Sequence, residues 1–244
     1  MRKRLTLLAV VLLACAGQKG GTLSLAADPW PPYVDPALPG EGVAASVVRT
    51  ALSRAGFETT FTVAEWSFVL AETKAGRFDA LADAWESAER ERDFAFSDPY
   101  LENEIVLVKK RSAPFSFEQV RTGERQDLVL GIVRDYAYGD ALAPLKRMPT
   151  RIDAYLTESL LHLVQGDVDV VLGDARAVRH HMHEFLRAHE ADLEISPEPM
   201  ARLPLRLAVA RVRPDHERIL TAFNRELAAM RADGTLAKLL AETR

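Results

Sequence analysis

The fold class that the sequence predicts is α/β, and three observations predict it. Short apolar runs rich in β-branched residues alternate along the chain with longer segments whose apolar positions have helical spacing. Hydrophobic residues make up 48% of the chain and charged residues 27%, which is typical of a globular protein. The 244 residues are enough for one large domain or for two modest lobes, each with its own core. Strands that alternate with helices favour mostly parallel sheets.

The first half of the chain contains four strand patterns and two helix patterns. The helix patterns stop at Gly56 and Gly76, and a glycine is a common helix terminator. We expect strands over 22–27, 59–63, 105–108 and from 78 to 81, and helices over 43–55 and 66–75.

The second half continues the alternation. The run 168–172 is almost continuously apolar, as in a strand that is buried on both faces. Thr157 can cap a helix that stops at Gly166, and Pro214 suits the first turn of another. We expect strands over 128–133, 168–172 and 205–210, and helices over 157–165, 175–189, 214–231 and 235–242.

The N-terminus has the pattern of an export signal. Three basic residues at positions 2–4 precede an apolar run over 5–14. A membrane span needs about 20 residues, so we interpret 1–14 as a secretory signal peptide. The sole cysteine, Cys15, follows at once in a pattern that resembles a bacterial lipobox, so we expect it to carry lipid, with 15–21 as a linker. Plain secretion and a buried N-terminal strand are the alternatives.

Charge and cysteine content exclude several classes of function. The formal net charge is −4, and loss of 1–14 removes three cations to leave −7, which does not suit a nucleic-acid partner. One cysteine allows no intramolecular disulfide and no cysteine-rich metal site. His180, His181 and His183 lie on one helix, and we interpret them as a solvated face and not as a metal site. We expect no metal and no cofactor.

A proline-rich aromatic loop follows the first strand, and ligand sites in α/β folds lie at the carboxyl ends of strands. Five segments carry further motifs in order along the chain: 27–33 (ADPWPPY), 75–80 (AGRFDA), 89–100 (ERERDFAFSDPY), 165–174 (QGDVDVVLGD) and the ending 224–239, which includes MRADGT. Together these segments resemble the bacterial extracellular solute-binding proteins of the polar amino acid type, which are partners of ABC importers.

The resemblance implies two α/β lobes with a ligand cleft between them and two hinge crossings. Lobe one would comprise 22–102 plus 205–244, and lobe two 105–200. The late strand 205–210 independently supplies the return to lobe one that such a discontinuous lobe requires. The implied protein is a monomer in the periplasm or otherwise outside the cytoplasm.

The resemblance also places the ligand contacts. Arg90 falls where the family holds a ligand carboxylate, and a guanidinium offers the matching pair of donors; Arg92 is the alternative. Asp174 falls where the family places the acceptor for the ligand ammonium, although it could be only a helix N-cap. Trp30 aligns with an aromatic residue that stacks on the ligand, and Asp28 could reach a basic ligand side chain.

The chain departs from the family at two places. Tyr136 and Ala137 stand in the second-lobe loop where a Thr or Ser hydroxyl is usual, so only backbone donors remain there. In the first lobe, Asp83 and Trp85 replace small and hydroxyl residues, and Ser87 is a partial substitute. Trp30, Trp66 and Trp85 could wall a site for a carboxylate-bearing solute with an apolar or cationic face.

The leading hypothesis is a binding protein that performs no chemistry and hands a small polar solute to an ABC permease. A ligand sensor for a signalling partner is the first alternative. A dehydratase of the aromatic amino acid pathway is the second, because some of these enzymes resemble the fold and Asp83 or Glu86 could serve as the acid.

Overall fold

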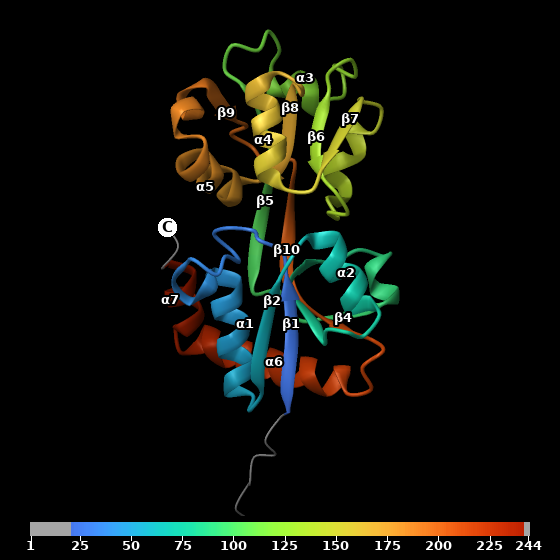
Figure 1. Ribbon diagram of the computed structural model, residues 1–244, viewed down its shortest axis with the longest axis vertical. Coiled ribbons are helices and arrows are strands. Elements are labelled where there is room, and N and C mark those ends of the chain that lie inside the picture. Colours follow the sequence, from blue (N-terminus) through green and yellow to red (C-terminus); the bar gives the residue numbers. More distant parts are fainter. Residues whose placement is uncertain (1–20, 242–244) are drawn as a thin grey trace, which may run out of the picture.

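The computed structural model describes residues 21–241. They form two lobes, one stacked on the other, and two long strands run from one lobe into the other (Figure 1). The strands are β1 (Thr22–Ala27), β2 (Glu58–Val63), β3 (Ala80–Trp85), β4 (Phe94–Phe96), β5 (Leu101–Lys110), β6 (Leu130–Val133), β7 (Thr150–Asp153), β8 (Val170–Asp174), β9 (Leu193–Ile195) and β10 (Ala201–Ala210). The α-helices are α1 (Val43–Arg54), α2 (Trp66–Lys74), α3 (Phe117–Arg121), α4 (Leu156–Gln165), α5 (Ala175–Phe185), α6 (His216–Ala232) and α7 (Thr235–Ala241).

All of these strands belong to one mixed sheet. Its order is β2-β1-β3-β10-β5-β8-β6-β7, with β4 paired to β10 and β9 paired to β5. The outer pairs β1–β2, β1–β3, β6–β7 and β6–β8 are parallel. Every described pair that includes β5 or β10 is antiparallel. The expectation of mostly parallel sheets is therefore wrong at the centre, because one strand carries the chain out of the lower lobe and the other carries it back.

The two crossing strands are longer than the sequence pattern suggested. The first part of β10 pairs with β5, from Ala201 opposite Ile105 to Leu205 opposite Leu101. Its second part pairs with β3 and β4 in the lower lobe. Charged residues interrupt the apolar pattern at this junction, and Arg202 on β10 contacts Glu104 on β5 at 2.7 Å. Arg202 also contacts Glu102 at 3.5 Å. Because these charged residues interrupt the apolar pattern, the sequence predicted only the buried ends of β5 and β10, at 105–108 and 205–210.

The lower lobe has helices on both faces of its part of the sheet (Figure 1). α1 packs against α6 and α7, and α2 packs against β1 and β3. Ile219, Phe223 and Leu227 of α6 are fully buried, and their spacing of four residues places them on one helix face. The C-terminal helices therefore belong to the same lobe as the first strands.

Helix limits in the second half differ from expectation at three places. α4 is capped at Tyr155 and not at Thr157, and the Glu158 carboxylate accepts hydrogen bonds from the backbone N–H groups of Ala154 (2.9 Å) and Tyr155 (3.3 Å). α5 ends at Phe185 and not at residue 189. The next residue, Leu186, has a non-helical backbone conformation, and its side chain is buried. α6 begins at His216, two residues after the proline that was expected to open it.

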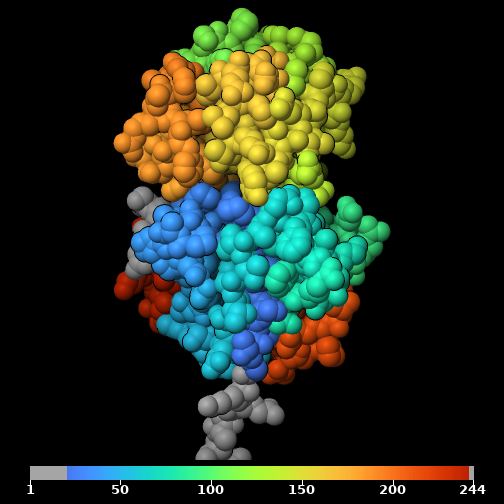
Figure 2. Space-filling model, viewed as in Figure 1, coloured from blue at the N-terminus to red at the C-terminus, as the bar shows by residue number. Residues whose placement is uncertain are grey.

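The two lobes meet with little open space between them on the face shown in Figure 2. No helix within residues 21–241 is both long enough and apolar enough to cross a membrane. The expected signal peptide, Cys15 and most of the linker lie outside the described residues.

Candidate functional site

A small pocket lies where the two lobes meet. It holds about 210 Å³ of space not filled by protein atoms, its open side included. Six of its lining residues were ligand candidates from sequence, and the seventh was a candidate wall. The lining residues are Asp28, Trp30, Trp66, Asp83, Trp85, Arg90 and Tyr136.

The elements that supply these residues explain their convergence. Asp28 follows the carboxyl end of β1, and Asp83 and Trp85 lie at the end of β3 next to it. Arg90 begins the short 3-10 helix η2 (Arg90–Arg92). Tyr136 follows β6 and comes from the upper lobe. Carboxyl ends of neighbouring parallel strands thus meet a loop of the other lobe.

Aromatic rings form the walls of the pocket. The rings of Trp30 and Trp85 meet edge to face, with centroids 5.5 Å apart. The Tyr136 ring lies among all three tryptophans, with centroids 6.1 Å from Trp30, 6.0 Å from Trp66 and 5.4 Å from Trp85. Four such rings exclude water, so charges between them interact more strongly than at a surface.

A glycine fixes the loop that carries Trp30. Gly42 has φ +98°, and a Cβ there would lie 2.4 Å from the carbonyl oxygen of Tyr33. Only glycine combines this backbone conformation with so close an approach. The proline-rich loop is thereby held against the start of α1, with Trp30 buried over the pocket.

Two buried carboxyl groups have very different surroundings. Asp28 accepts a hydrogen bond from the Tyr136 hydroxyl at 2.5 Å, and burial raises the pKa of Asp28 to about 6. Asp83 is only 4% exposed, and neither of its carboxyl oxygens has a hydrogen-bond partner among residues 21–241. Burial, reinforced by the charge of Asp28, raises the pKa of Asp83 well above its usual range.

Arg90 is the positive group of the pocket and is 7% exposed. Its two terminal nitrogens donate to the carbonyl oxygens of Trp85 and Asp135, each at 2.7 Å. The guanidinium also lies 4.9 Å from the centroid of the Trp66 ring. Burial lowers the pKa of Arg90 to about 10, so it is charged at neutral pH. A guanidinium has five N–H donors, so donors remain for a ligand. The alternative, Arg92, is exposed and donates to the carbonyl of Glu89.

Asp174 does not line this pocket. One of its oxygens accepts hydrogen bonds from the Tyr33 hydroxyl (2.8 Å) and from the backbone N–H groups of Arg176 (3.0 Å) and Ala177 (2.9 Å). Its other oxygen accepts from the side-chain amide of Asn103 at 2.9 Å. The helix N-cap alternative thus describes Asp174 as the structure has it, and in this conformation Asp174 does not line the pocket that contains Arg90, so its contact with a solute ammonium stays a prediction.

Ser87 and Ala137 also lie outside the pocket lining. The Ser87 hydroxyl accepts a hydrogen bond from the Arg90 backbone N–H at 3.3 Å, and Ala137 packs against the main core. Asn103 was not predicted from the sequence; its side-chain oxygen accepts from the Trp85 indole N–H at 2.9 Å. The only signal for it in the sequence is an asparagine between two glutamates.

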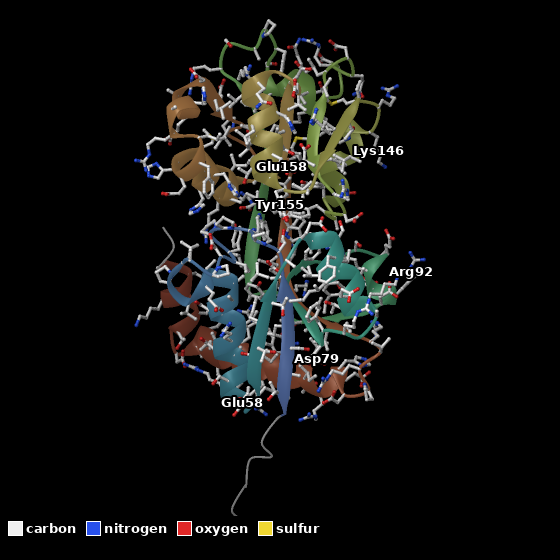
Figure 3. The ribbon with its side chains drawn as sticks, viewed as in Figure 1. Glu58, Asp79, Arg92, Lys146, Tyr155 and Glu158 are labelled. Carbon is white, nitrogen blue, oxygen red and sulfur yellow. The ribbon has the colours of Figure 1, made fainter. Side chains whose placement is uncertain are left out.

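Hydrogen bonds join the lobes around the pocket. The Trp66 indole N–H and Arg90 both donate to the Asp135 carbonyl, at 3.0 Å and 2.7 Å. The bonds from Tyr136 to Asp28 and from Tyr33 to Asp174 also link the lobes. Tyr155, labelled in Figure 3 at the lower end of α4, lines a neighbouring cavity at the same junction. The conformation is therefore a closed one.

The histidines of α5 do not converge on a metal site. The interpretation of a solvated face is wrong for His181, which is buried with its Nδ1 3.0 Å from the Thr157 hydroxyl. Burial lowers the pKa of His181 to about 4. Within the described part of the chain, no three His, Cys, Asp or Glu side chains are arranged to hold a metal ion.

Known proteins share this architecture. The ABC transporter arginine-binding protein 1 of Escherichia coli (strain K12) is 26% identical over 183 residues, which cover 75% of this chain and 72% of the relative. An ancestral arginine-binding protein bound to arginine has a TM-score of 0.78 at 18% identity, with 93% of this chain and 99% of that chain covered. A histidine kinase sensor domain similar to periplasmic binding proteins also has a TM-score of 0.78, at 19% identity, with 91% and 95% covered.

At 18% and 19% sequence identity, the two solved structures show that the fold is shared and nothing more. The family model for bacterial extracellular solute-binding proteins, family 3, matches residues 23–242, which is nearly all of the chain outside the N-terminal segment. Together with the two lobes and the pocket between them, this match assigns the chain to a family: it belongs to the bacterial extracellular solute-binding proteins, family 3.

Proposed function

We propose that this protein captures a small polar solute, an amino acid or a related carboxylate or amine, in the interlobe pocket and delivers it to an ABC permease. The observation that carries the proposal is the convergence of Arg90, two carboxyl groups and four aromatic rings at the lobe junction. The relative named as an arginine-binding protein supports an amino-acid-like solute. Binding energy would favour closure, and the permease would recognise the closed form.

Arg90 takes the carboxylate of the solute in this proposal. A carboxylate would meet the guanidinium donors that the carbonyls of Trp85 and Asp135 leave open. Trp30, Trp66 and Trp85 would cover the apolar or cationic remainder of the solute. The residues between lobes, about 102–105 and 200–205, serve as hinges, since β5 and β10 pair with each other there.

The proposal places the protein outside the cytoplasm as a monomer. Residues 1–14 would be the signal peptide, and Cys15 would carry the lipid that holds the protein on the membrane. Mass spectrometry of protein extracted from membranes should find an acylated Cys15 and no residues 1–14. An intact Met1 on the native protein would refute the proposed lipid anchor and would leave the proposed binding function unaffected.

A thermal-shift screen with amino acids, amines and small organic acids tests the binding function. A solute at 100-fold its dissociation constant should stabilise the fold by about 2.7 kcal/mol. Incubation with prephenate or arogenate serves as the control for a dehydratase. Turnover of either compound, or the absence of any stabilising solute, would refute a pure binding function.

A further inference from the structure

The proposed function gives no separate role to the carboxyl group of Asp83. Asp83 lies on the fully buried strand β3 and lines the pocket, yet neither oxygen has a hydrogen-bond partner within residues 21–241. Burial of a carboxyl group without a hydrogen-bond partner costs free energy, so a native structure that contains one needs an explanation, such as a ligand that supplies the partner. The position of Asp83 in the pocket lining points to a ligand.

Asp174, the acceptor that the resemblance suggests for an ammonium group, is already saturated. Four donors from Tyr33, Asn103 and the first turn of α5 occupy its two oxygens. A solute that contacted Asp174 would compete with the cap of α5, the interlobe bond from Tyr33 or the bond from Asn103. Its contacts make it a structural carboxylate.

We propose that Asp83, with Asp28 beside it, replaces Asp174 as the acceptor for the positive group of the solute, so that the pocket selects small organic cations. This inference rests on the proposed solute-binding function and narrows its substrate class. A carboxylate on the solute would add a contact with Arg90, but the cation is the required feature.

The surroundings of Asp83 favour a cation. Asp28 and Asp83 share the pocket with one guanidinium, that of Arg90, so the net charge of these groups is −1 when both acids are ionised. The aromatic side chains of Trp30, Trp85 and Tyr136 line the same pocket as Asp83, and cations bind aromatic rings well in a dry site. Methylated ammonium and guanidinium groups both have this chemistry.

Binding of a cation should release a proton. The charged and titratable groups around Asp83 are Asp28 after β1, Arg90 from η2, Tyr100 before β5 and Tyr136 from the upper lobe. Burial and the charge of Asp28 raise the pKa of Asp83 more than the charge of Arg90 lowers it, which favours the protonated acid in the absence of solute. A bound cation would stabilise the ionised form and expel that proton.

The experiment is calorimetric titration with agmatine, L-arginine, choline and glutarate, in two buffers of different ionisation enthalpy. At least one of the three cations should bind, and glutarate, which has carboxylates and no cation, should not. Asp83→Asn should weaken cation binding about 30-fold or more and release about one proton fewer. Its melting temperature without solute should not fall, because an uncharged amide replaces a buried carboxyl group whose ionised form is disfavoured by burial.

Asp174→Asn is the matched control. It should keep the proton release of the parent, because Asp174 does not touch the solute. If Asp83→Asn binds the cations as tightly as the parent does, or if only glutarate binds, the inference is wrong and the solute-binding function stands. If the full thermal-shift screen finds no solute at all, the binding function itself fails.

Discussion

Arg90 keeps a full positive charge in a pocket that is walled by indole rings. Its neighbours offset the cost of burial: two carbonyl oxygens accept its hydrogen bonds, and the Trp66 ring lies 4.9 Å from the guanidinium. Such a group is already oriented before the solute arrives. Its interaction with a solute carboxylate therefore requires little reordering.

Replacement of Arg90 tests this role. Arg90→Ala should weaken binding of a carboxylate-bearing solute by about 2–5 kcal/mol, because the buried ligand charge loses its partner. Arg90→Lys should restore only part of the affinity, since one ammonium cannot reproduce the planar fork. Calorimetry of both variants measures the effect, and equal affinity of Arg90→Ala and the parent would exclude Arg90 from the site.

Asp28 makes the stability of the empty protein depend on pH. Its folded pKa is about 6 and its ordinary value 3.8, so the unfolded chain gives up the proton first as the pH rises. The contribution of Asp28 to stability should therefore fall between about pH 4 and pH 7, by roughly 3 kcal/mol for a shift of this size. Asp28→Asn should remove this loss in urea unfolding without solute. Asp140→Asn, at an exposed site, should follow the parent, and a parent-like slope in Asp28→Asn would refute the assignment.

At the scale of elements, sequence patterns predicted the features that depend on neighbouring residues, such as the ends of helices. Glycines with positive φ follow α1, α2 and α4 at Gly56, Gly76 and Gly166, where the sequence predicted the helices to stop. The short strands β4, β7 and β9 were missed. Each has only three or four residues and depends on pairing with a distant segment, which no local pattern reveals.

The sequence indicated which residues line the pocket better than it indicated their hydrogen-bond partners. Family motifs pointed to Arg90, Asp28 and Trp30, because loops that follow neighbouring strands meet at one edge of the sheet. The partners of Asp174 lie 71 and 141 residues away, at Asn103 and Tyr33. The contact with Tyr33 arises from the closure of the two lobes and that with Asn103 from the pairing of β5 with β8, and neither leaves a periodic trace in the sequence.

The contact between α4 and α5 should weaken in acid. His181 has a folded pKa of about 4 against an ordinary 6.5, so the unfolded chain takes up the proton first as the pH falls. The contribution of His181, present above pH 6.5, should be lost progressively towards pH 4, by roughly 3 kcal/mol, and it opposes the contribution of Asp28 over the same range. His181→Gln can keep a bond to Thr157 and should lose less stability than the parent as the pH falls.

The same helix offers the control for that experiment. His183 has a side chain that is 59% exposed, so His183→Gln should leave the acid limb as it is in the parent. Circular dichroism of urea unfolding between pH 4 and pH 7 would compare the three proteins. Equal acid sensitivity of His181→Gln and the parent would locate the titrating group elsewhere.

At the scale of the whole molecule, the fold joins two lobes through two strands and a small set of side-chain bonds. β5 and β10 carry the covalent connection, and their exposed ion pairs contribute little rigidity. The bonds from Tyr33, Trp66, Arg90 and Tyr136 across the junction hold the closed form. All of these except the bond from Tyr33 involve pocket residues, so Tyr33 allows closure to be changed without altering the solute contacts.

Tyr33→Phe should shift the molecule towards an open form. The substitution removes the hydroxyl that donates to Asp174 across the junction and keeps the ring that packs 4.4 Å from Trp30. A hydrogen bond to a charged acceptor contributes about 1.5–3 kcal/mol, so the closed fraction of the empty protein should fall. Small-angle scattering should then show a larger radius of gyration without solute. Affinity should drop about tenfold, because a smaller fraction is competent to bind.

Tyr138→Phe is the control for this last prediction, because it makes the same chemical change inside one lobe. The Tyr138 hydroxyl donates to the Leu172 carbonyl and accepts from the Val133 N–H, both in the upper lobe. Its loss should lower the stability of that lobe and leave the radius of gyration unchanged. If both variants open the molecule equally, or if neither does, the Tyr33 bond does not control closure, and the solute alone must supply the energy that brings the lobes together.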